Sequence, residues 1–383
     1  MSIASRAVFL FGVFAGPVVA AEPPFPTELS IGFGYEESAT DRPLVVLDGI
    51  PSAAYAYSAN GRSHVVDVAA TRWFAPVADD GRTPLALLPY VARSSSATAR
   101  FALTGASRDS IGNFSGQESD LEVRLAGDGS LRKADLSAEW FFCRSLAVRG
   151  GFGYETERET AASTSVERPS GRADVSTTAT RTSGATGTLG VALRLGEHEV
   201  SASGSYGETD QTREDASAFT GSAQPFFSTL TSEGIVRRGA LGTRLIFLDR
   251  RLAVDISGSY ALTTSSSDLA ASLSGPFVQG RALSREAAVE ATWFATRRLG
   301  LSAGFGYGTR SVSSGFPGRV RPSRSETGRA FSARLRWFAS ERASAVLSAS
   351  RTKGDEVSPP DSLTYQRFEE TVDRVTLGAA LRF

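Results

Sequence analysis

Apolar and polar residues alternate with a period of two along much of the chain. In residues 29–35, 146–154, 189–195 and 299–307, nearly every second position is large and apolar or aromatic, and most positions between them are small or polar. Successive side chains of a β-strand point to opposite faces, whereas a helix would repeat every 3.6 residues. The pattern therefore predicts β-strands with one apolar and one polar face.

The predicted strands belong to a repeated hairpin. Each of the four tryptophans is followed by phenylalanine, and the segments that begin at Trp140, Ile246 and Trp293 align without gaps, with a close fourth copy at Trp337. Each copy reads as a strand end, a short turn and the start of the next strand. Three of the strands that follow end in a tyrosine after small residues, as the first predicted strand does at Tyr35.

Two architectures can use this alternation: a soluble sandwich with its apolar face inward, or a transmembrane barrel with that face toward lipid. The aromatic residues gather near both strand ends, as interfacial girdles do, and the polar face carries too many charges for a dry core. We therefore predict an all-β fold, a transmembrane antiparallel up-and-down barrel. The expected girdles are Trp73, Trp140, Trp293 and Trp337 at the short-turn end, and Tyr35, Tyr154, Tyr260 and Tyr307 at the other end.

Long polar segments separate the hairpins and set the strand number. They are expected to be extracellular loops, opposite short periplasmic turns. Seven such loops predict fourteen strands, with residues 76–96 as a long periplasmic connection. A sixteen-strand alternative arises if 84–128 holds three strands instead of one. The seven segments are 38–63, 109–133, 158–183, 209–234, 264–282, 311–327 and 355–370.

The first 21 residues have the features of a secretory signal peptide. Arg6 precedes an apolar run over residues 7–15, and Pro17 and small residues follow. This run is shorter than the roughly 20 residues that span a bilayer as a helix. We expect cleavage before Glu22, export through the general secretory route, and a single barrel domain over residues 22–383.

Composition excludes several classes of function. The 383 residues include 41 Lys and Arg and 41 Asp and Glu, so the formal net charge is zero. General nucleic-acid binding relies on a basic surplus, and we expect no nucleic-acid partner. One cysteine and two histidines are too few for a structural zinc or iron–sulfur site, and no cofactor or metal is expected.

The C-terminal strand resembles the β-signal that the barrel-assembly machinery recognises in Gram-negative outer-membrane proteins. The matching residues are Thr376, Gly378, Leu381 and Phe383. The resemblance implies an outer-membrane location with that machinery, membrane lipid and lipopolysaccharide as partners. A second, shorter resemblance, in residues 72–77, 84–90 and 93–95, is to an uncharacterised family of porin-like proteins from proteobacteria, in which this segment joins the second and third strands.

The polar face of the strands suggests what the barrel does. Charge rings in a pore set its ion preference, and arginines outnumber acids among the positions that parity assigns to the lumen. We predict a porin-like passive channel for small polar solutes with mild anion preference; alternatively, arginines and acids pair and seal the lumen. The pore-lining candidates are Arg149, Arg194, Arg244, Arg334, Arg336, Arg374, Arg382, Glu139, Asp255 and Glu290.

Two other functions use different parts of the chain. A surface-binding or accessory structural barrel would use the long polar loops, such as 158–183. A barrel hydrolase would need a histidine with a nearby acid, and His64 with Asp67 is the pair that could face outer-leaflet substrates. Strand parity, however, puts these two side chains on opposite faces, and we expect no enzyme.

Overall fold

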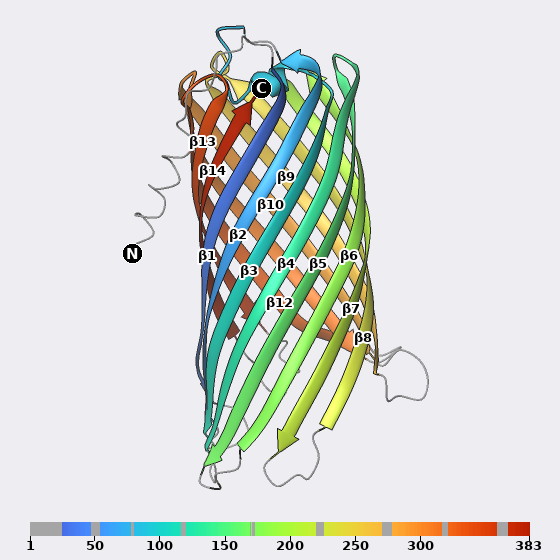
Figure 1. Cartoon of the computed structure of the whole chain (residues 1–383), viewed down its shortest axis with the longest axis vertical. Coiled ribbons are helices and arrows are strands. Elements are labelled where there is room, and N and C mark those ends of the chain that lie inside the picture. Colours follow the sequence, from blue (N-terminus) through green and yellow to red (C-terminus); the bar gives the residue numbers. More distant parts are fainter. Residues whose placement is uncertain are drawn as a thin grey trace.

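Fourteen antiparallel strands close into one barrel in the computed structural model (Figure 1). Each strand pairs with the next in sequence, and β1 pairs with β14 to close the cylinder. The predicted fold and the smaller strand number are thereby confirmed. The structure describes residues 25–46, 54–77, 80–115, 120–168, 170, 173–219, 226–269, 278–315, 321–357 and 367–383, so the expected signal peptide lies outside the described residues.

The strands have 15 to 24 residues, and those later in the chain are the shorter ones. They are β1 Phe25–Val46, β2 Ala54–Val77, β3 Ser96–Ser115, β4 Asp120–Cys143, β5 Leu146–Arg168, β6 Ala173–Leu195, β7 His198–Phe219, β8 Phe226–Phe247, β9 Leu252–Leu269, β10 Val278–Thr296, β11 Leu299–Gly315, β12 Arg321–Phe338, β13 Ala343–Val357 and β14 Arg367–Arg382.

The two ends of the barrel differ in their connections. At the turn end, tight turns join β4 to β5, β6 to β7 and β10 to β11. At the opposite end, here called the loop end, the polar segments expected to be loops continue as β-structure over much of their length. Residues 158–168 belong to β5, for example, and 173–183 belong to β6.

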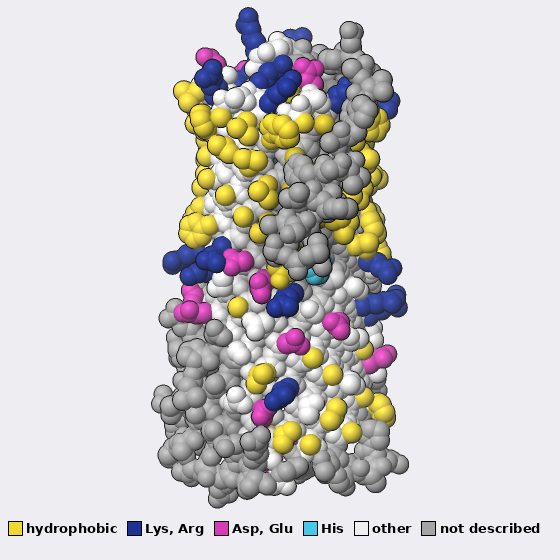
Figure 2. Space-filling view, turned by 60° about the vertical axis from the view of Figure 1, so that its left-hand side comes forward, with side chains coloured by type: hydrophobic (Ala, Val, Ile, Leu, Met, Phe, Trp, Pro, Cys, Tyr) yellow, Lys and Arg dark blue, Asp and Glu magenta, His cyan; other side chains and the backbone are white. Residues whose placement is uncertain are grey.

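These strands are longer than a membrane requires. The longest have 24 residues, whereas about 9–11 residues of a tilted strand cross a bilayer. Figure 2 shows a belt of apolar side chains over the turn-end half only, with charged residues along its lower border. On the side that Figure 2 shows, the loop-end half of the barrel thus has a largely polar outer face and projects beyond the belt.

Aromatic residues frame this belt. Trp140, Trp293 and Trp337 are 47–53% exposed on the outer face at the turn end, and Tyr154, Tyr260 and Tyr307 are 44–46% exposed on its far side. Trp140 is the register partner of Val148 on β5, and Tyr154 lies six residues farther along that strand. Six residues of a strand span about 20 Å, which is the distance between the two aromatic girdles here. Tyr35 lies on the outer face beside His64, with ring centroids 5.3 Å apart.

Trp73 does not fit the predicted girdle. It is only 6% exposed and packs inside the barrel against Val77, Leu85, Leu88 and Phe338, while Phe74 takes the outer face. The two side chains therefore point in the opposite directions to those of Trp337 and Phe338, where the tryptophan faces outward and the phenylalanine faces inward. Trp73 shares strand parity with the lumen-facing Asp67, six residues earlier, and this parity explains its inward direction.

No helix among the described residues is long and apolar enough to cross a bilayer. A helix of five residues, α2 (Leu88–Ala92), belongs to the connection between β2 and β3 and lies at the turn end (Figure 1).

Candidate functional site

The connection between β2 and β3 fills the turn end of the barrel. We call residues 80–95 the plug. Leu85 and Thr83 are fully buried, and Leu87 and Leu88 are at most 5% exposed. The sequence predicts a long periplasmic connection over residues 76–96 but not its packing, and in the structure its apolar residues form small hydrophobic cores with the barrel wall.

Two apolar clusters hold the plug. In the first, Leu85 and Leu88 pack with Trp73, Val77 and Phe338. In the second, Leu87 packs with Ile246, Ala253 and Phe294. The Trp-Phe repeats therefore serve both surfaces of the wall, because Trp293 and Trp337 face outward while the phenylalanines beside them face the plug.

Hydrogen bonds from wall arginines satisfy the plug backbone. Arg382 donates to the carbonyl of Leu85 at 3.0 Å, Arg194 to that of Tyr90 at 2.7 Å, and Arg297 to that of Thr83 at 3.1 Å. In the other direction, the Tyr90 hydroxyl donates to the carbonyl of Glu197 at 3.0 Å. These bonds come from β14, β6 and turns of the wall, so the plug is tied around the circumference.

A polar latch fixes the start of the plug. Arg250, in the turn after β8, lies 2.9 Å from the Asp80 carboxylate and 2.6 Å from that of Glu197. Burial opposes ionisation of Asp80. Hydrogen bonds from the Thr83 hydroxyl and from the Thr83 and Arg82 amides, together with the charge of Arg250, nevertheless lower its pKa to about 2. Asp80 is thus a carboxylate at neutral pH.

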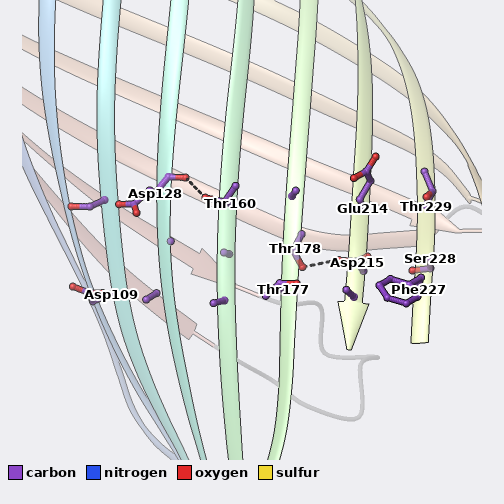
Figure 3. Close-up of a pocket in the computed structure, with 17 residues that line it drawn as sticks. Asp109, Asp128, Thr160, Thr177, Thr178, Glu214, Asp215, Phe227, Ser228 and Thr229 are labelled. Carbon is purple, nitrogen blue, oxygen red and sulfur yellow. Dashed lines mark hydrogen bonds between the residues drawn. The ribbon is translucent and has the colours of Figure 1, made fainter. Parts of the chain in front are cut away.

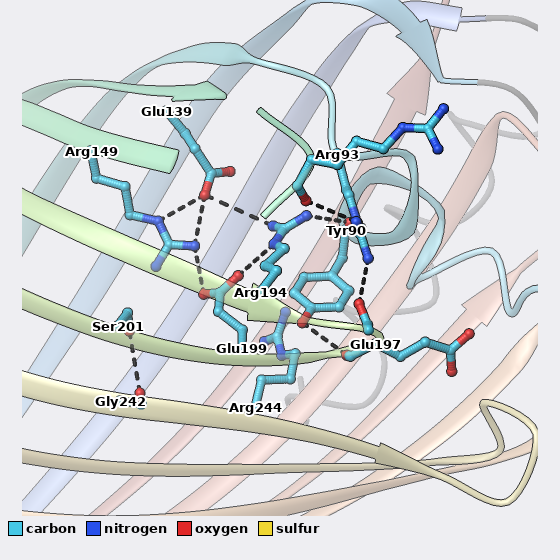
Figure 4. Close-up of polar contacts among 12 residues, drawn as sticks. Tyr90, Arg93, Glu139, Arg149, Arg194, Glu197, Glu199, Ser201, Gly242 and Arg244 are labelled. Carbon is cyan, nitrogen blue, oxygen red and sulfur yellow. Dashed lines mark hydrogen bonds and ion pairs between the residues drawn. The ribbon is translucent and has the colours of Figure 1, made fainter. Parts of the chain in front are cut away.

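A four-residue ion-pair network lies directly against the plug (Figure 4). Arg149 bridges Glu139 at 2.7 Å and Glu199 at 2.7 Å, and Arg194 binds the other oxygen of Glu199 at 2.8 Å. Arg194 and Glu199 are 3% and 7% exposed. The Arg194 guanidinium also stacks over the Tyr90 ring, 4.2 Å from its centroid. The network therefore couples four wall strands, β4 to β7, to the plug.

Four other predicted pore-lining arginines also pair with acids on the wall. Arg244 pairs with Asp255 at 2.6 Å and Arg334 with Glu290 at 3.2 Å, and both of these acids had been predicted. Arg382 pairs with Glu28 at 2.6 Å and Arg374 with Glu36 at 2.5 Å. The pairs run along the wall between nearby strands, so they neutralise the lining without crossing the lumen.

The arginine excess inferred from parity is smaller in the structure. Glu28, Glu36 and Glu199 lie at lumen-facing positions that the sequence assignment left out, and each pairs with an arginine that it had included. A period-two count along one strand could have found them. Their pairing depends on the register between strands, which the sequence pattern does not give.

Some lumen arginines have no acidic partner. Arg238 lines a polar cavity of about 550 Å³ together with Glu139, Arg149, Asp135 and Lys133. Within the described part of the chain, Arg238 and Arg336 form no ion pair, and the Nε of Arg336 is buried without a hydrogen-bond partner. The Arg336 guanidinium lies over the Phe338 ring, 5.0 Å from its centroid.

The predicted assembly signal lies at the seam of the barrel. Phe383 exchanges two backbone hydrogen bonds with Thr27, at 2.9 and 3.0 Å. Gly378 lies opposite Gly32 of β1 in the register, Leu381 opposite Leu29, and the Thr376 hydroxyl bonds to that of Ser348 on β13. These residues close the cylinder, and their recognition by the assembly machinery stays a prediction.

The histidines are not arranged as a catalytic site. His64 faces outward beside Tyr35, whereas Asp67 faces the lumen and pairs with Arg100. His198 accepts a hydrogen bond from the Ile246 amide at 3.2 Å. Among the described residues, no group of three or more His, Cys, Asp or Glu side chains could hold a metal ion.

A separate hollow lies on the loop-end half, across β3 to β8 (Figure 3). Its labelled residues include Asp109, Asp128, Glu214 and Phe227. Phe227 is 69% exposed, and these four share strand parity with residues of the outer face. The hollow is therefore distinct from the lumen and from the plug.

Comparison with known proteins shows the fold and no family. No family model and no curated protein matches the chain. Among solved structures, a FadL homologue of Pseudomonas aeruginosa is 10% identical, with a TM-score of 0.50, and covers 94% of this chain and 90% of its own. A mutant of the TodX monoaromatic hydrocarbon channel is 11% identical, with a TM-score of 0.53, and covers 94% and 91%. The chain thus has the fold of outer-membrane barrels.

Proposed function

We propose that the protein is a passive channel of the Gram-negative outer membrane for small polar solutes, closed at its periplasmic end by the plug. The turn end would face the periplasm and the loop end the exterior. The observation that carries the proposal is a polar, ion-paired lumen that ends at one short segment of the chain. The neighbouring folds named as channels support it.

The polar lining argues for polar solutes. Solutes entering from the loop end meet Ser and Thr side chains, glycine backbone and paired charges, such as those around the cavity that Arg238 lines. The apolar clusters of the turn end are occupied by plug residues, among them Leu85, Leu87 and Leu88. A mild anion preference is part of the proposal and depends on the arginines without acidic partners.

Conductance in planar bilayers tests the proposal. We expect small or rare openings for the wild type, and at least tenfold more open time when Pro84 to Arg93 is replaced by a Gly-Ser linker of equal length. Because that linker removes apolar packing, a milder variant, Arg250→Gln, is measured beside it and should increase open time in the same direction. Arg213→Gln, at the loop end, is the matched control.

Two results would contradict the proposal. Equal conductance of the wild type and both plug variants would show that the plug does not close the path. A reversal potential that indicates clear cation preference in a salt gradient would remove the anion preference while leaving the channel itself intact.

A further inference from the structure

Several tyrosines of the outer face have an arginine directly opposite them on the neighbouring strand. Arg237 is the register partner of Tyr206, Arg285 of Tyr260 and Arg329 of Tyr307. Residues directly opposite each other in an antiparallel pair point to the same face. These exposed arginines therefore lie on the outer surface, at the loop-end border of the apolar belt, where Figure 2 shows charged side chains.

One part of this border places like charges side by side. Arg329 on β12 lies directly opposite Lys353 on β13, and Arg351 lies two residues away on the same face. Directly opposed like charges destabilise a sheet. Asp373 binds Arg351 with two contacts of 2.7 Å, whereas Arg285, Arg329 and Lys353 form no ion pair with any described residue.

The border is not uniformly basic. Glu37 lies 3.8 Å from Arg62, and Glu208 accepts a hydrogen bond from the Tyr206 hydroxyl at 2.9 Å. Acids therefore neutralise part of the border. Arg285 on β10 and Arg329 on β12 form no ion pair with a described residue, and Lys353 on β13 shares the charge of Asp373 with Arg351. An anion from outside the chain would relieve the remaining repulsion between Arg329 and Lys353.

We infer that Arg285, Arg329 and Lys353, here called the basic collar, bind the phosphate groups of an anionic glycolipid of the outer leaflet. Arginine presents a planar set of donors that suits phosphate oxygens, and lysine adds a point charge. Tyr260 and Tyr307 beside them occupy the depth at which aromatic rings meet lipid headgroups. The collar lies at the border of the apolar belt that is farther from the plug, so with the plug toward the periplasm the leaflet is the outer one. The inference requires residence in the membrane but not transport.

Binding of bisphosphorylated lipid A to the purified full chain, followed by native mass spectrometry, tests the inference. The collar variant Arg285→Gln, Arg329→Gln and Lys353→Gln should bind at least tenfold more weakly than the wild type. The matched control, Arg62→Gln, Arg124→Gln and Arg351→Gln, removes three exposed positive charges that already have acidic partners. It should bind within about threefold of the wild type.

Two further measurements distinguish binding of a phosphorylated lipid from binding of free phosphate. Dephosphorylated lipid A should bind the wild type as weakly as the collar variant binds lipid A, and millimolar inorganic phosphate should not compete. Equal binding of both lipids, competition by phosphate alone, or equal loss in the control would overturn the inference. If the triple variant does not show the heat-modifiable migration of a folded barrel, Arg329→Gln alone is used, with an expected loss of about threefold. Unchanged conductance of the collar variant would leave the channel proposal unaffected.

Discussion

The two halves of the barrel use the same strands in different ways. On β6, residues 189–195 carry leucine and valine on the outer face, and Arg194 is buried on the inner face. On the same strand, residues 177–183 are mostly threonine, serine and alanine, so neither face is strongly apolar. The alternation continues through both halves, but within the described ranges only the turn-end half has an apolar outside and a filled inside. The comparison shows that strand pairing alone does not determine the surroundings of a side chain.

The largest expected effect concerns the buried ion pairs. Arg194→Ala leaves Glu199 buried with one cation, and removing one partner of a buried pair typically costs about 3–5 kcal/mol. Arg213→Ala, in the loop-end half, breaks an exposed pair with Asp215 and should cost roughly 0–1 kcal/mol. Urea unfolding in lipid vesicles, followed by tryptophan fluorescence, measures both. Similar losses of unfolding free energy for the two variants would mean that ion pairs contribute equally to stability in the two halves.

A charge placed on the outer face should change the free energy of unfolding differently in the two halves, and this difference should be smaller than the one for the ion pairs. Leu136→Arg puts a charge in the middle of the apolar belt, where Leu136 is 60% exposed, and should cost about 2–4 kcal/mol. Ala179→Arg, on the outer face of the loop-end half, should change the free energy of unfolding by less than about 0.5 kcal/mol. The same unfolding assay applies. An equal penalty at both sites would extend the lipid contact over the whole barrel.

The smallest effect comes from the latch at the start of the plug. The pKa of Asp80 is lowered to about 2 from 3.8, so its contribution to plug attachment is present above pH 4 and is lost as pH falls toward 2. Because the Asp80 side chain is 44% exposed, solvent screening keeps this contribution small. Channel open time should increase over that pH range.

Substitution separates this effect from general acid damage. Asp80→Asn should show raised open time at neutral pH and a flatter response between pH 4 and 2. Asp128→Asn, at the loop end, should behave as the wild type. A response that is identical in all three proteins would assign the pH effect to other groups.

Strand parity predicted from the sequence which face of the barrel many side chains take. It assigned Glu139 and Arg149 to the lumen and separated His64 from Asp67, because each assignment needs only the position along one strand. It missed the Glu199 partner of Arg149, since that contact spans β5 and β7. The plug could not be predicted because Leu85 and Leu88 pack on residues from distant hairpins. Trp73 was misplaced because the Trp-Phe motif was given more weight than its parity with Asp67.

The hydrogen bond from Arg382 to Leu85 joins residues 297 positions apart in the chain. The seat of the plug also needs Arg194 from β6 and the turn that carries Arg297, and the cylinder closes only when β14 meets β1. The plug precedes twelve of the fourteen strands in the sequence, yet its full binding surface exists only when β14 has joined β1. The seat of the plug is therefore a property of the closed cylinder, and a partly formed barrel offers the plug only some of these contacts.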